Sequence, residues 1–334
     1  MTVRELLQGM LRELPTSQRP VIAADPALDV PCTDVIYDSR QAKRGSVFVA
    51  LRGQRADGAA FAPHAVAGGA VAVLSERAAM PDVPAPWIVV PNARLALGHL
   101  AAEFFGHPSR RMKVVGITGT NGKRTTGSLM RSIFEAAGVQ CGLMGTVTCR
   151  IGDTEMAATR TTPEAPEVQG LMRQMVDAGC GACIVEIASR ALAMRRVDGI
   201  RFAAGIFTNL TCDHLDVHHD VESSFAAQRR LFEMLPVDSP AVFNLDDPRG
   251  ASLIEIAGWP VTYAVNRDAD VTPGPLTFGL EGLTFDVRMP QGTAHVKSRL
   301  VGRPNVYNIL AATATAAWLG LRIREIEDGL AMSC

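Results

Sequence analysis

A recurring unit of apolar strand, turn and helix constrains the fold of this chain more than any other feature of its sequence. The clearest unit begins with the apolar run 113–118, continues through a glycine-rich turn, and enters a helical segment at 125–137. Further apolar runs lie at 183–189, 204–210 and 242–247, alternating with helical segments at 165–178 and 221–235. Apolar strands that alternate with helices are typical of a parallel sheet covered on both faces. The sequence therefore predicts an α/β fold with a mainly parallel central sheet.

The length and the change of pattern along the chain predict two domains. A chain of 334 residues is too long for one ordinary core. Residues 1–105 begin with an amphipathic helix and continue with short strand-like and helix-like segments, which predicts a small N-terminal α/β domain. Residues 106–334 contain the parallel-sheet pattern, followed by alternating antiparallel strands at 276–300 and an Ala-rich helix at 305–319.

Composition excludes several classes of protein. The formal net charge is −1, so no global charge attracts nucleic acid or an anionic membrane. No apolar run approaches the ~18 residues of a membrane span, so we expect a cytoplasmic protein without membrane insertion. Seven scattered cysteines predict reduced, partly buried thiols. Cys180 and Cys183 form a C-x-x-C pair, but Cys183 lies in a predicted buried strand, so a redox or zinc site is the weaker interpretation.

The segment Gly116–Thr126 predicts a phosphate-binding loop between a strand and a helix. Successive backbone N–H groups in such a turn can hold an anion, and Lys123 would reach the terminal phosphates. The alternative is an ordinary glycine-rich turn. A Ser or Thr normally follows the lysine and binds Mg²⁺, whereas Arg124 stands here and a guanidinium cannot bind a metal. Thr125 is about 100° further around the helix and is no simple substitute.

Several motifs in this order resemble the Mur ligase family, and within it the MurE type, over essentially the whole chain. They are Tyr37–Arg40, Gly45–Gly53, Asp57–Gly58, Gly119–Lys123, Thr161–Pro163, Glu186–Leu192, Phe207–Leu210, Asp213–Asp216, Asn244–Asp247 and Gly302–Asn308. The resemblance implies a small UDP-sugar-binding-like domain at 1–105 and an ATP-binding-like central domain at 106–334. It also implies peptidoglycan chemistry, in which ATP and Mg²⁺ activate the carboxylate of a UDP-MurNAc-dipeptide for attack by an amino acid.

The resemblance assigns roles to individual positions. It implies that Lys123 contacts phosphate, while Glu186 and His214 serve as metal ligands. It places nucleotide-binding positions at Gly119, Thr120, Asn121, Gly122, Lys123, Thr125, Asn305 and Asn308, with the last two near the adenine. It places positions that hold the UDP-MurNAc-peptide at Ser39, Thr161, Thr162, Ser189 and Arg196.

This chain departs from the family pattern at positions close to the expected chemistry. Arg124 replaces the magnesium-binding hydroxyl, and Gln228 replaces a lysine whose carbamylated side chain organises a second metal. Arg190 replaces a histidine and Ala188 replaces a serine. Further departures are Ala59 in place of histidine and Pro304 in place of phenylalanine. The chain ends at 334, where the family's third domain would begin, so we expect that domain to be absent, in a fragment or in a naturally short protein.

Three functions remain open. The first is a degenerate, non-catalytic Mur ligase homologue that binds UDP-MurNAc-peptide, nucleotide or both, and acts as a sensor, scaffold or partner of a full-length Mur ligase or other cell-wall enzyme. The second is a fragment of an active ligase that adds diaminopimelate or lysine. The third is an interaction module on a relic fold.

Two hypotheses concern individual sites. Magnesium is doubtful here, and we expect the Arg124 guanidinium to lie within ~4 Å of Glu186 as a fixed substitute for the ion. The His- and Asp-rich segment 213–220 would suggest an independent metal site in isolation, with a solvated polar loop as the alternative.

Overall fold

The computed structural model describes residues 1–53, 56–158, 160–211 and 221–332. It divides into two compact units. Unit 1 comprises Met1–Pro108, Glu164–Arg173 and Met194–Ile200, and unit 2 comprises Ser109–Pro163, Gln174–Ala193 and the described residues from Arg201 onward. The chain therefore returns to unit 1 twice after residue 108, which the expected contiguous boundary at residue 105 did not include.

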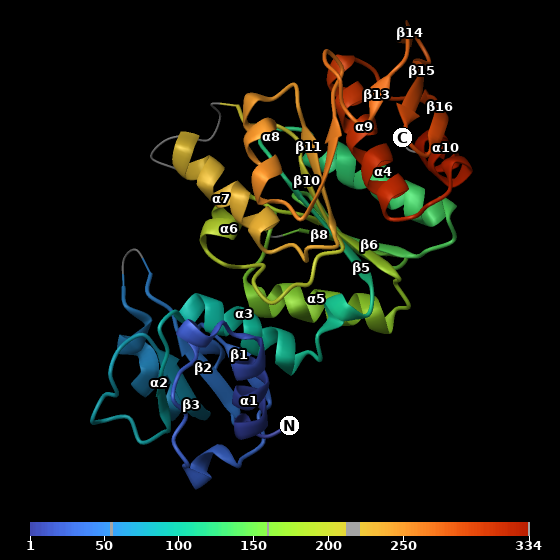
Figure 1. Ribbon diagram of the computed structural model, residues 1–334. Helices are drawn as coiled ribbons and strands as arrows, with labels where there is room; N and C mark the ends of the chain where they lie inside the picture. Colours follow the sequence, from blue (N-terminus) through green and yellow to red (C-terminus); the bar gives the residue numbers. More distant parts are fainter. Residues whose placement is uncertain (54–55, 159, 212–220, 333–334) are drawn as a thin grey trace. The chain divides into compact units, whose positions relative to one another are not determined.

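Unit 1 is a parallel four-stranded sheet in the order β1-β2-β3-β4 (Figure 1). The strands are β1 (Asp34–Ile36), β2 (Ser46–Ala50), β3 (Ala70–Ser75) and β4 (Trp87–Val89), and the helices are α1 (Val3–Glu13), α2 (Ala62–Ala67) and α3 (Ala93–Phe104). Successive residues of β2 enter different cores, because side chains alternate across a strand. Val47 and Val49 pack with residues of α1 and α3, whereas Phe48 packs with Ala62 of α2. The helices thus cover both faces of this sheet.

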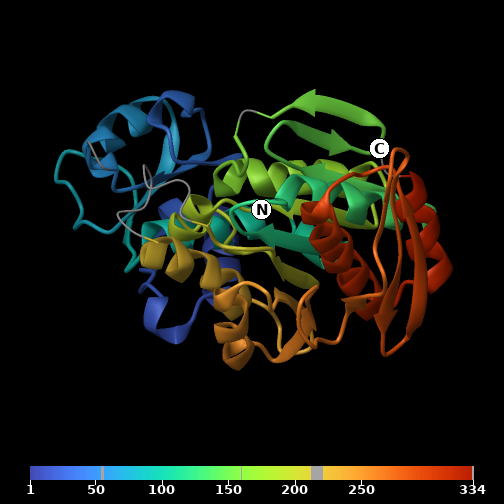
Figure 2. The same ribbon diagram turned by 90° about the horizontal axis from the view of Figure 1, so that it is seen from above.

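Unit 2 is built on an eight-stranded sheet in the order β12-β11-β10-β5-β9-β6-β7-β8 (Figures 1 and 2). The strands are β5 (Lys113–Thr118), β6 (Cys141–Met144), β7 (Thr148–Ile151), β8 (Thr154–Ala157), β9 (Ala182–Glu186), β10 (Ala204–Phe207), β11 (Pro240–Asn244) and β12 (Trp259–Tyr263). All neighbours from β12 to β6 are parallel, and β7 and β8 add an antiparallel edge. The predicted α/β fold with a mainly parallel sheet is confirmed.

The remaining elements include a second, smaller sheet in unit 2 and several helices, of which the helix at 165–177 belongs largely to unit 1. The helices are α4 (Lys123–Ala136), α5 (Ala165–Asp177), α6 (Ser189–Ala193), α7 (Val221–Glu233), α8 (Pro248–Ser252), α9 (Arg303–Trp318) and α10 (Ile323–Met332). The small sheet comprises β13 (Thr272–Pro273), β14 (Thr277–Gly279), β15 (Gly282–Met289) and β16 (Gly292–Ser298), all antiparallel to their partners. Burial alternates along β15, as the sequence pattern of 276–300 predicted.

The alanine content of α9 explains its position in unit 2. Ala311, Ala312 and Ala314 are fully buried in the same core as Ile133 of α4 and Val242 of β11. Small side chains let helix backbones approach closely, so α9 lies directly beside the helix that follows the glycine-rich turn. This contact brings the first turn of α9 to that turn.

No helix among the described residues is long and apolar enough to cross a membrane. The five cysteines within the described ranges are buried free thiols, whereas Cys212 and Cys334 lie outside them. Burial raises the pKa of Cys32 and Cys149 to about 11 and that of Cys183 well above its ordinary value. These thiols are therefore protonated and poorly nucleophilic at neutral pH.

Candidate functional site

The glycine-rich turn 119–122 connects the carboxyl end of β5 to the start of α4. Gly119 and Gly122 have φ angles of +137° and +89°, a region that side chains with a Cβ rarely adopt. A Cβ at Gly119 would lie 2.0 Å from the Thr208 hydroxyl oxygen, and one at Gly122 would lie 2.4 Å from Asn308 Oδ1. Both positions therefore require glycine, for backbone conformation and for space.

Residues that follow β10 hold this loop in place. Asn209 Oδ1 accepts a hydrogen bond of 3.0 Å from the Asn121 amide, and the Thr208 hydroxyl donates one of 2.6 Å to the Asn121 carbonyl. The Thr120 amide donates to the Asn209 carbonyl at 2.8 Å. The loop is thus a fixed turn at the carboxyl edge of the parallel sheet, where ligands bind in open α/β folds.

Lys123 is folded back onto the loop that precedes it. Its Nζ donates to the carbonyls of Gly119 and Thr120, at 2.6 and 2.9 Å. Burial lowers the pKa of Lys123, and the nearby carboxylate of Glu186 opposes that shift. A partly desolvated ammonium beside the first amides of α4 is suited to an anionic ligand.

A cavity of about 430 Å³ opens beside the loop. Its lining combines the loop with residues that follow β10 and β11 and with the first turns of α9: Asn121, Gly122, Thr208, Asn209, Asn244, Asp246, Asp247, Pro248, Tyr263, Arg303, Pro304, Tyr307 and Asn308. Asn121 and Gly122 of the loop therefore border a cavity, as expected of a phosphate loop. The lining is rich in amides and hydroxyls, which fits a polar, uncharged group such as a nucleoside.

Asn308 connects the cavity wall to the helix of the phosphate loop. It is 7% exposed, and its Oδ1 accepts a hydrogen bond of 3.3 Å from the Thr126 hydroxyl. Its Nδ2 donates to Asn305 Oδ1 at 2.9 Å, and Asn305 in turn donates to the Val301 carbonyl. Of the two asparagines expected near the base, Asn308 lines the cavity and Asn305 orients it.

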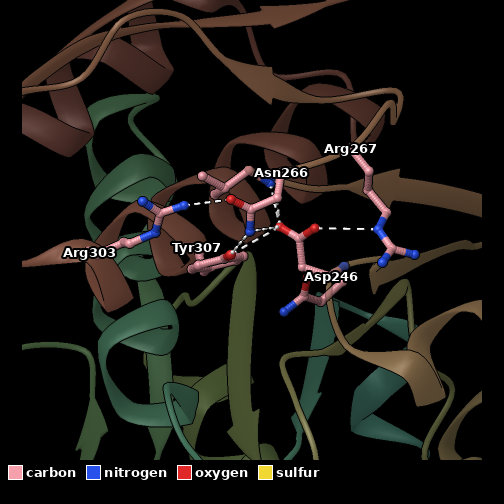
Figure 3. Close-up of polar contacts among 7 residues, drawn as sticks. Asp246, Asn266, Arg267, Arg303 and Tyr307 are labelled. Carbon is pink, nitrogen blue, oxygen red and sulfur yellow. Dashed lines mark hydrogen bonds and ion pairs between the residues drawn. The ribbon is translucent and has the colours of Figure 1, made fainter.

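Asp246 is the centre of a polar cluster at this cavity that the sequence reasoning did not assign (Figure 3). Its Oδ2 accepts four hydrogen bonds of 2.7–3.1 Å, from the amides of Val265 and Asn266, the Asn266 side chain and the Tyr307 hydroxyl. Its Oδ1 lies 3.5 Å from Arg267 Nε. Burial raises the pKa of Tyr307, and the bond to Asp246 adds to that shift. We call Asp246, Asn266, Arg303, Tyr307 and Asn308 the α9 network.

The metal-side positions, namely Arg124, Glu186, Arg190 and Gln228, form no comparable cluster. Glu186 is 1% exposed, and its Oε2 accepts hydrogen bonds from the hydroxyl and amide of Thr146, at 2.7 and 3.2 Å. Arg124 and Arg190 are exposed. No hydrogen bond or ion pair joins Arg124, Arg190 or Gln228 to Glu186 within the described part of the chain.

The expected pairing of Arg124 with Glu186 is therefore wrong. Helix α4 begins at Lys123, so residue 124 is about 100° around the helix axis from the lysine. There its side chain is exposed and solvated, and Thr146 satisfies Glu186 in its place.

Two of the described metal-side positions, Arg124 and Gln228, carry no anionic group that could bind a magnesium ion. Gln228 is 2% exposed and neutral, and its Oε1 has no hydrogen-bond partner among the residues that the structure describes. Among the described residues, no three His, Cys, Asp or Glu side chains are grouped so that they could hold a metal. His214 and the rest of segment 213–220 lie outside the described residues.

The positions expected to hold the UDP-MurNAc-peptide have varied surroundings. The Thr162 hydroxyl donates to the Glu186 carbonyl at 3.0 Å and accepts from the Ala188 amide at 3.2 Å, so it fixes the end of β9. Thr161 is partly exposed, and Ser189 begins α6. Arg196 belongs to unit 1, where it forms an ion pair of 2.8 Å with the buried Glu164.

Unit 1 contains its own cavity of about 600 Å³, lined by Tyr37, Asp38, Ser39, Arg40, Phe48, Leu51, Ala56, Gly58, Phe61 and His64. Ser39 is 9% exposed, and its hydroxyl lies 3.2 Å from Nδ1 of His64. The bidentate hydrogen bonds from Arg40 hold the pKa of Asp38 below its ordinary value. Ala59 is buried in the core of this unit, so His64 supplies the imidazole at this cavity.

Comparison with known proteins agrees with this architecture. A family model described as the Mur ligase middle domain matches residues 117–316, and one described as the Mur ligase family, catalytic domain, matches residues 32–105. A UDP-N-acetylmuramoyl-L-alanyl-D-glutamate–2,6-diaminopimelate ligase from Geobacter metallireducens is 43% identical over 300 residues, covering 88% of this chain. A UDP-N-acetylmuramyl-tripeptide synthetase from a Roseiflexus species is 42% identical over 314 residues, covering 89% of this chain.

The chain spans about three fifths of the length of these curated relatives, 59% and 62% respectively. Among solved structures, a UDP-N-acetylmuramoyl-L-alanyl-D-glutamate–2,6-diaminopimelate ligase superposes with a TM-score of 0.86 at 27% identity, covering 99% of this chain and 66% of the other. MurF ligase from Thermotoga maritima in complex with ADP shares the fold at a TM-score of 0.59 and 18% identity, covering 88% of this chain and 65% of the other. This chain belongs to the Mur ligase family, and its relatives include ligases of the MurE type.

Proposed function

We propose that this chain is a degenerate MurE-like Mur ligase homologue of peptidoglycan synthesis. It binds nucleotide at the phosphate loop without the hydroxyl and the carbamylated lysine that Arg124 and Gln228 replace, and it binds UDP-MurNAc-peptide through positions such as Ser39. It acts as a sensor, scaffold or partner of another cell-wall enzyme rather than as a ligase. Phosphoryl transfer from ATP requires neutralisation of charge between two anions, which Mg²⁺ normally supplies.

One observation carries the proposal. The loop and the α9 network are closed by hydrogen bonds around a cavity, whereas two metal-side positions hold an exposed arginine and a buried neutral amide. The residues that would bind a nucleotide are thus arranged for binding, while those that would make it reactive are replaced.

The dependence of nucleotide affinity on Mg²⁺ tests this proposal. We expect the dissociation constant of ATP, measured by calorimetry, to change by less than about threefold between EDTA and excess Mg²⁺. Arg124→Thr restores the missing hydroxyl and should make Mg²⁺ strengthen ATP binding by about tenfold, the equivalent of one charge-assisted contact. The matched control is Arg324→Thr, on the exposed face of α10, which should behave as the native chain does. A native chain whose ATP affinity rises tenfold or more with Mg²⁺ would contradict the proposal.

A second candidate, part of an active ligase, is favoured by the retained Lys123 and Glu186, whose charges interact. It predicts ATP-dependent addition of diaminopimelate or lysine to UDP-MurNAc-dipeptide. Tripeptide formation coupled to phosphate release by the native chain would establish it over our first proposal.

A further inference from the structure

We infer that Arg303 is a specificity-determining residue that contacts the base of the bound nucleotide, and that Asp246 positions it through Asn266. This inference rests on the proposed binding of nucleotide, and it assigns a role to Arg303, a position of the segment Gly302–Asn308 that the resemblance left without one.

The first step concerns where Arg303 lies along the cavity. Asn308 is next to Gly122 in the phosphate loop, and Arg303 is five residues earlier on the same helix. At a rise of 1.5 Å per residue, the two positions are separated by about 7 Å along the helix axis. Both residues line the same cavity. A ribose separates phosphates from base by a comparable length, so a nucleotide with its phosphates at Gly122 reaches the Arg303 end with its base.

The second step asks which groups at that end can still bind a ligand. Oδ2 of Asp246 already accepts four hydrogen bonds. The Tyr307 hydroxyl donates to Asp246 and accepts from Asn266 Nδ2 at 3.0 Å. These groups form the wall and have little remaining capacity.

Arg303 differs from the wall groups. Within the described residues, its hydrogen bond is a single one, from Nη2 to Asn266 Oδ1 at 2.5 Å. A guanidinium has five N–H donors and a flat face, so most of its capacity remains for a ligand. Figure 3 shows Arg303 and Asn266 joined beside Tyr307, with Asp246 beyond Asn266.

The chemistry of a guanidinium suits a base at this place. Its plane stacks on aromatic rings, and its donors match the ring nitrogens and carbonyl oxygens of bases. Asn266 is held by three contacts to Asp246 and Tyr307 through its side-chain and backbone nitrogens, so its Oδ1 is a fixed anchor for the guanidinium. Such an anchor lowers the cost of ordering a long side chain when the ligand binds.

The test compares ATP with inorganic triphosphate, which has no base, by calorimetry on the full chain. We expect Arg303→Ala to weaken ATP binding by about fivefold to tenfold, within the range of stacking contacts of a guanidinium, and to leave triphosphate affinity within about twofold. Asn266→Ala should weaken ATP by a smaller factor, again without effect on triphosphate. Arg267→Ala is the matched control, because Arg267 also contacts Asp246 but does not line the cavity.

Several results would overturn the assignment. An unchanged ATP affinity in Arg303→Ala would overturn it, as would an equal loss for ATP and triphosphate, which indicates general loosening of the site. Full ATP affinity in Arg303→Lys, together with a loss in Arg303→Ala, would assign the effect to charge rather than to base contact. A native chain that binds neither ligand would overturn the proposed function as well.

Discussion

The α9 network and the metal-side positions of unit 2 flank the same phosphate loop and differ in how their polar groups are satisfied. Across the α9 network, Asn308 is bonded to Asn305 and to Thr126 of the loop helix, and Tyr307 is bonded to Asp246. On the metal side, Glu186 is held by Thr146, whereas Gln228 is buried and its side-chain oxygen has no partner within the described ranges. Buried polar groups usually find partners, so an orphaned one calls for an explanation.

Because of this difference, nucleotide binding and phosphoryl transfer depend on different groups of residues. The phosphate loop depends on its backbone conformation, which Gly119, Gly122 and the ends of β5 and β10 determine. Its geometry does not depend on the residue at position 124, which is exposed. A metal site depends on particular side-chain ligands and is lost when those residues change. A chain can therefore retain the first property after losing the second.

The largest expected effect on stability comes from a substitution in the phosphate loop. Gly119→Ala places a Cβ 2.0 Å from the Thr208 hydroxyl, at a φ of +137°. We expect a loss of about 2–4 kcal/mol in the free energy of unfolding in urea, because strain and a clash with a hydrogen-bonded residue combine. Gly138→Ala is the matched control, since its φ is also positive, at +74°, but a Cβ there meets nothing within 4 Å. It should cost only about 1 kcal/mol. Equal losses of unfolding free energy in the two variants would show that the phosphate loop is not rigid.

A smaller effect on stability is expected from replacing the buried side-chain amide of Gln228. Gln228→Met keeps a similar volume and removes a buried carbonyl that has no hydrogen-bond partner in the described part of the chain. It should raise the free energy of unfolding by about 1 kcal/mol. Gln228→Lys, which restores the family residue, should instead destabilise by about 3 kcal/mol if it remains an unpaired buried cation. A destabilised Gln228→Met protein would mean that this position has polar partners after all, and the contrast with the α9 network would weaken.

The smallest effect is a pH dependence from Lys123. Its pKa is lowered in the folded chain from 10.5, mainly by burial, so the unfolded chain binds more protons between the lowered value and 10.5. Stability therefore rises with pH across that window, where the folded chain has released the buried charge. Below the lowered pKa, both states are protonated and the cost of burial is constant. The unfolding free energy of the native chain, relative to Lys123→Met, should increase from pH 8 to pH 10.5. A difference that is flat or falls would contradict the burial of a charged Lys123.

Sequence patterns predicted the parts of the fold with strong periodicity. The run 113–118 became β5, and the alternating segment 276–300 became β14 to β16. The elements β4, α3 and α10 were not assigned from the sequence. Nor was the return of segments 164–173 and 194–200 to unit 1, since long-range packing leaves no local signal.

Some residues of the candidate site were predicted from the sequence and others were not, for a related reason. Gly122 and Asn308 meet at the cavity because their places follow from backbone geometry, whereas Gly119 and Lys123 are not among its lining residues. The Arg124–Glu186 pairing required a side-chain direction that charge alone does not determine, and it was wrong. The Asp246 cluster was missed, although Asn244–Asp247 directly follows an apolar strand and could have indicated it.

The most direct test of the central claim is a crystal structure of the chain soaked with ATP and Mn²⁺, whose anomalous scattering locates the metal. Our account predicts the triphosphate at the start of α4, on the amides of Gly122–Thr125, with Glu186 still bound to Thr146 and no manganese coordinated by protein side chains. A manganese ion that bridges Glu186 and the phosphates would contradict it, because the magnesium site would then be intact and the chain would be built for catalysis.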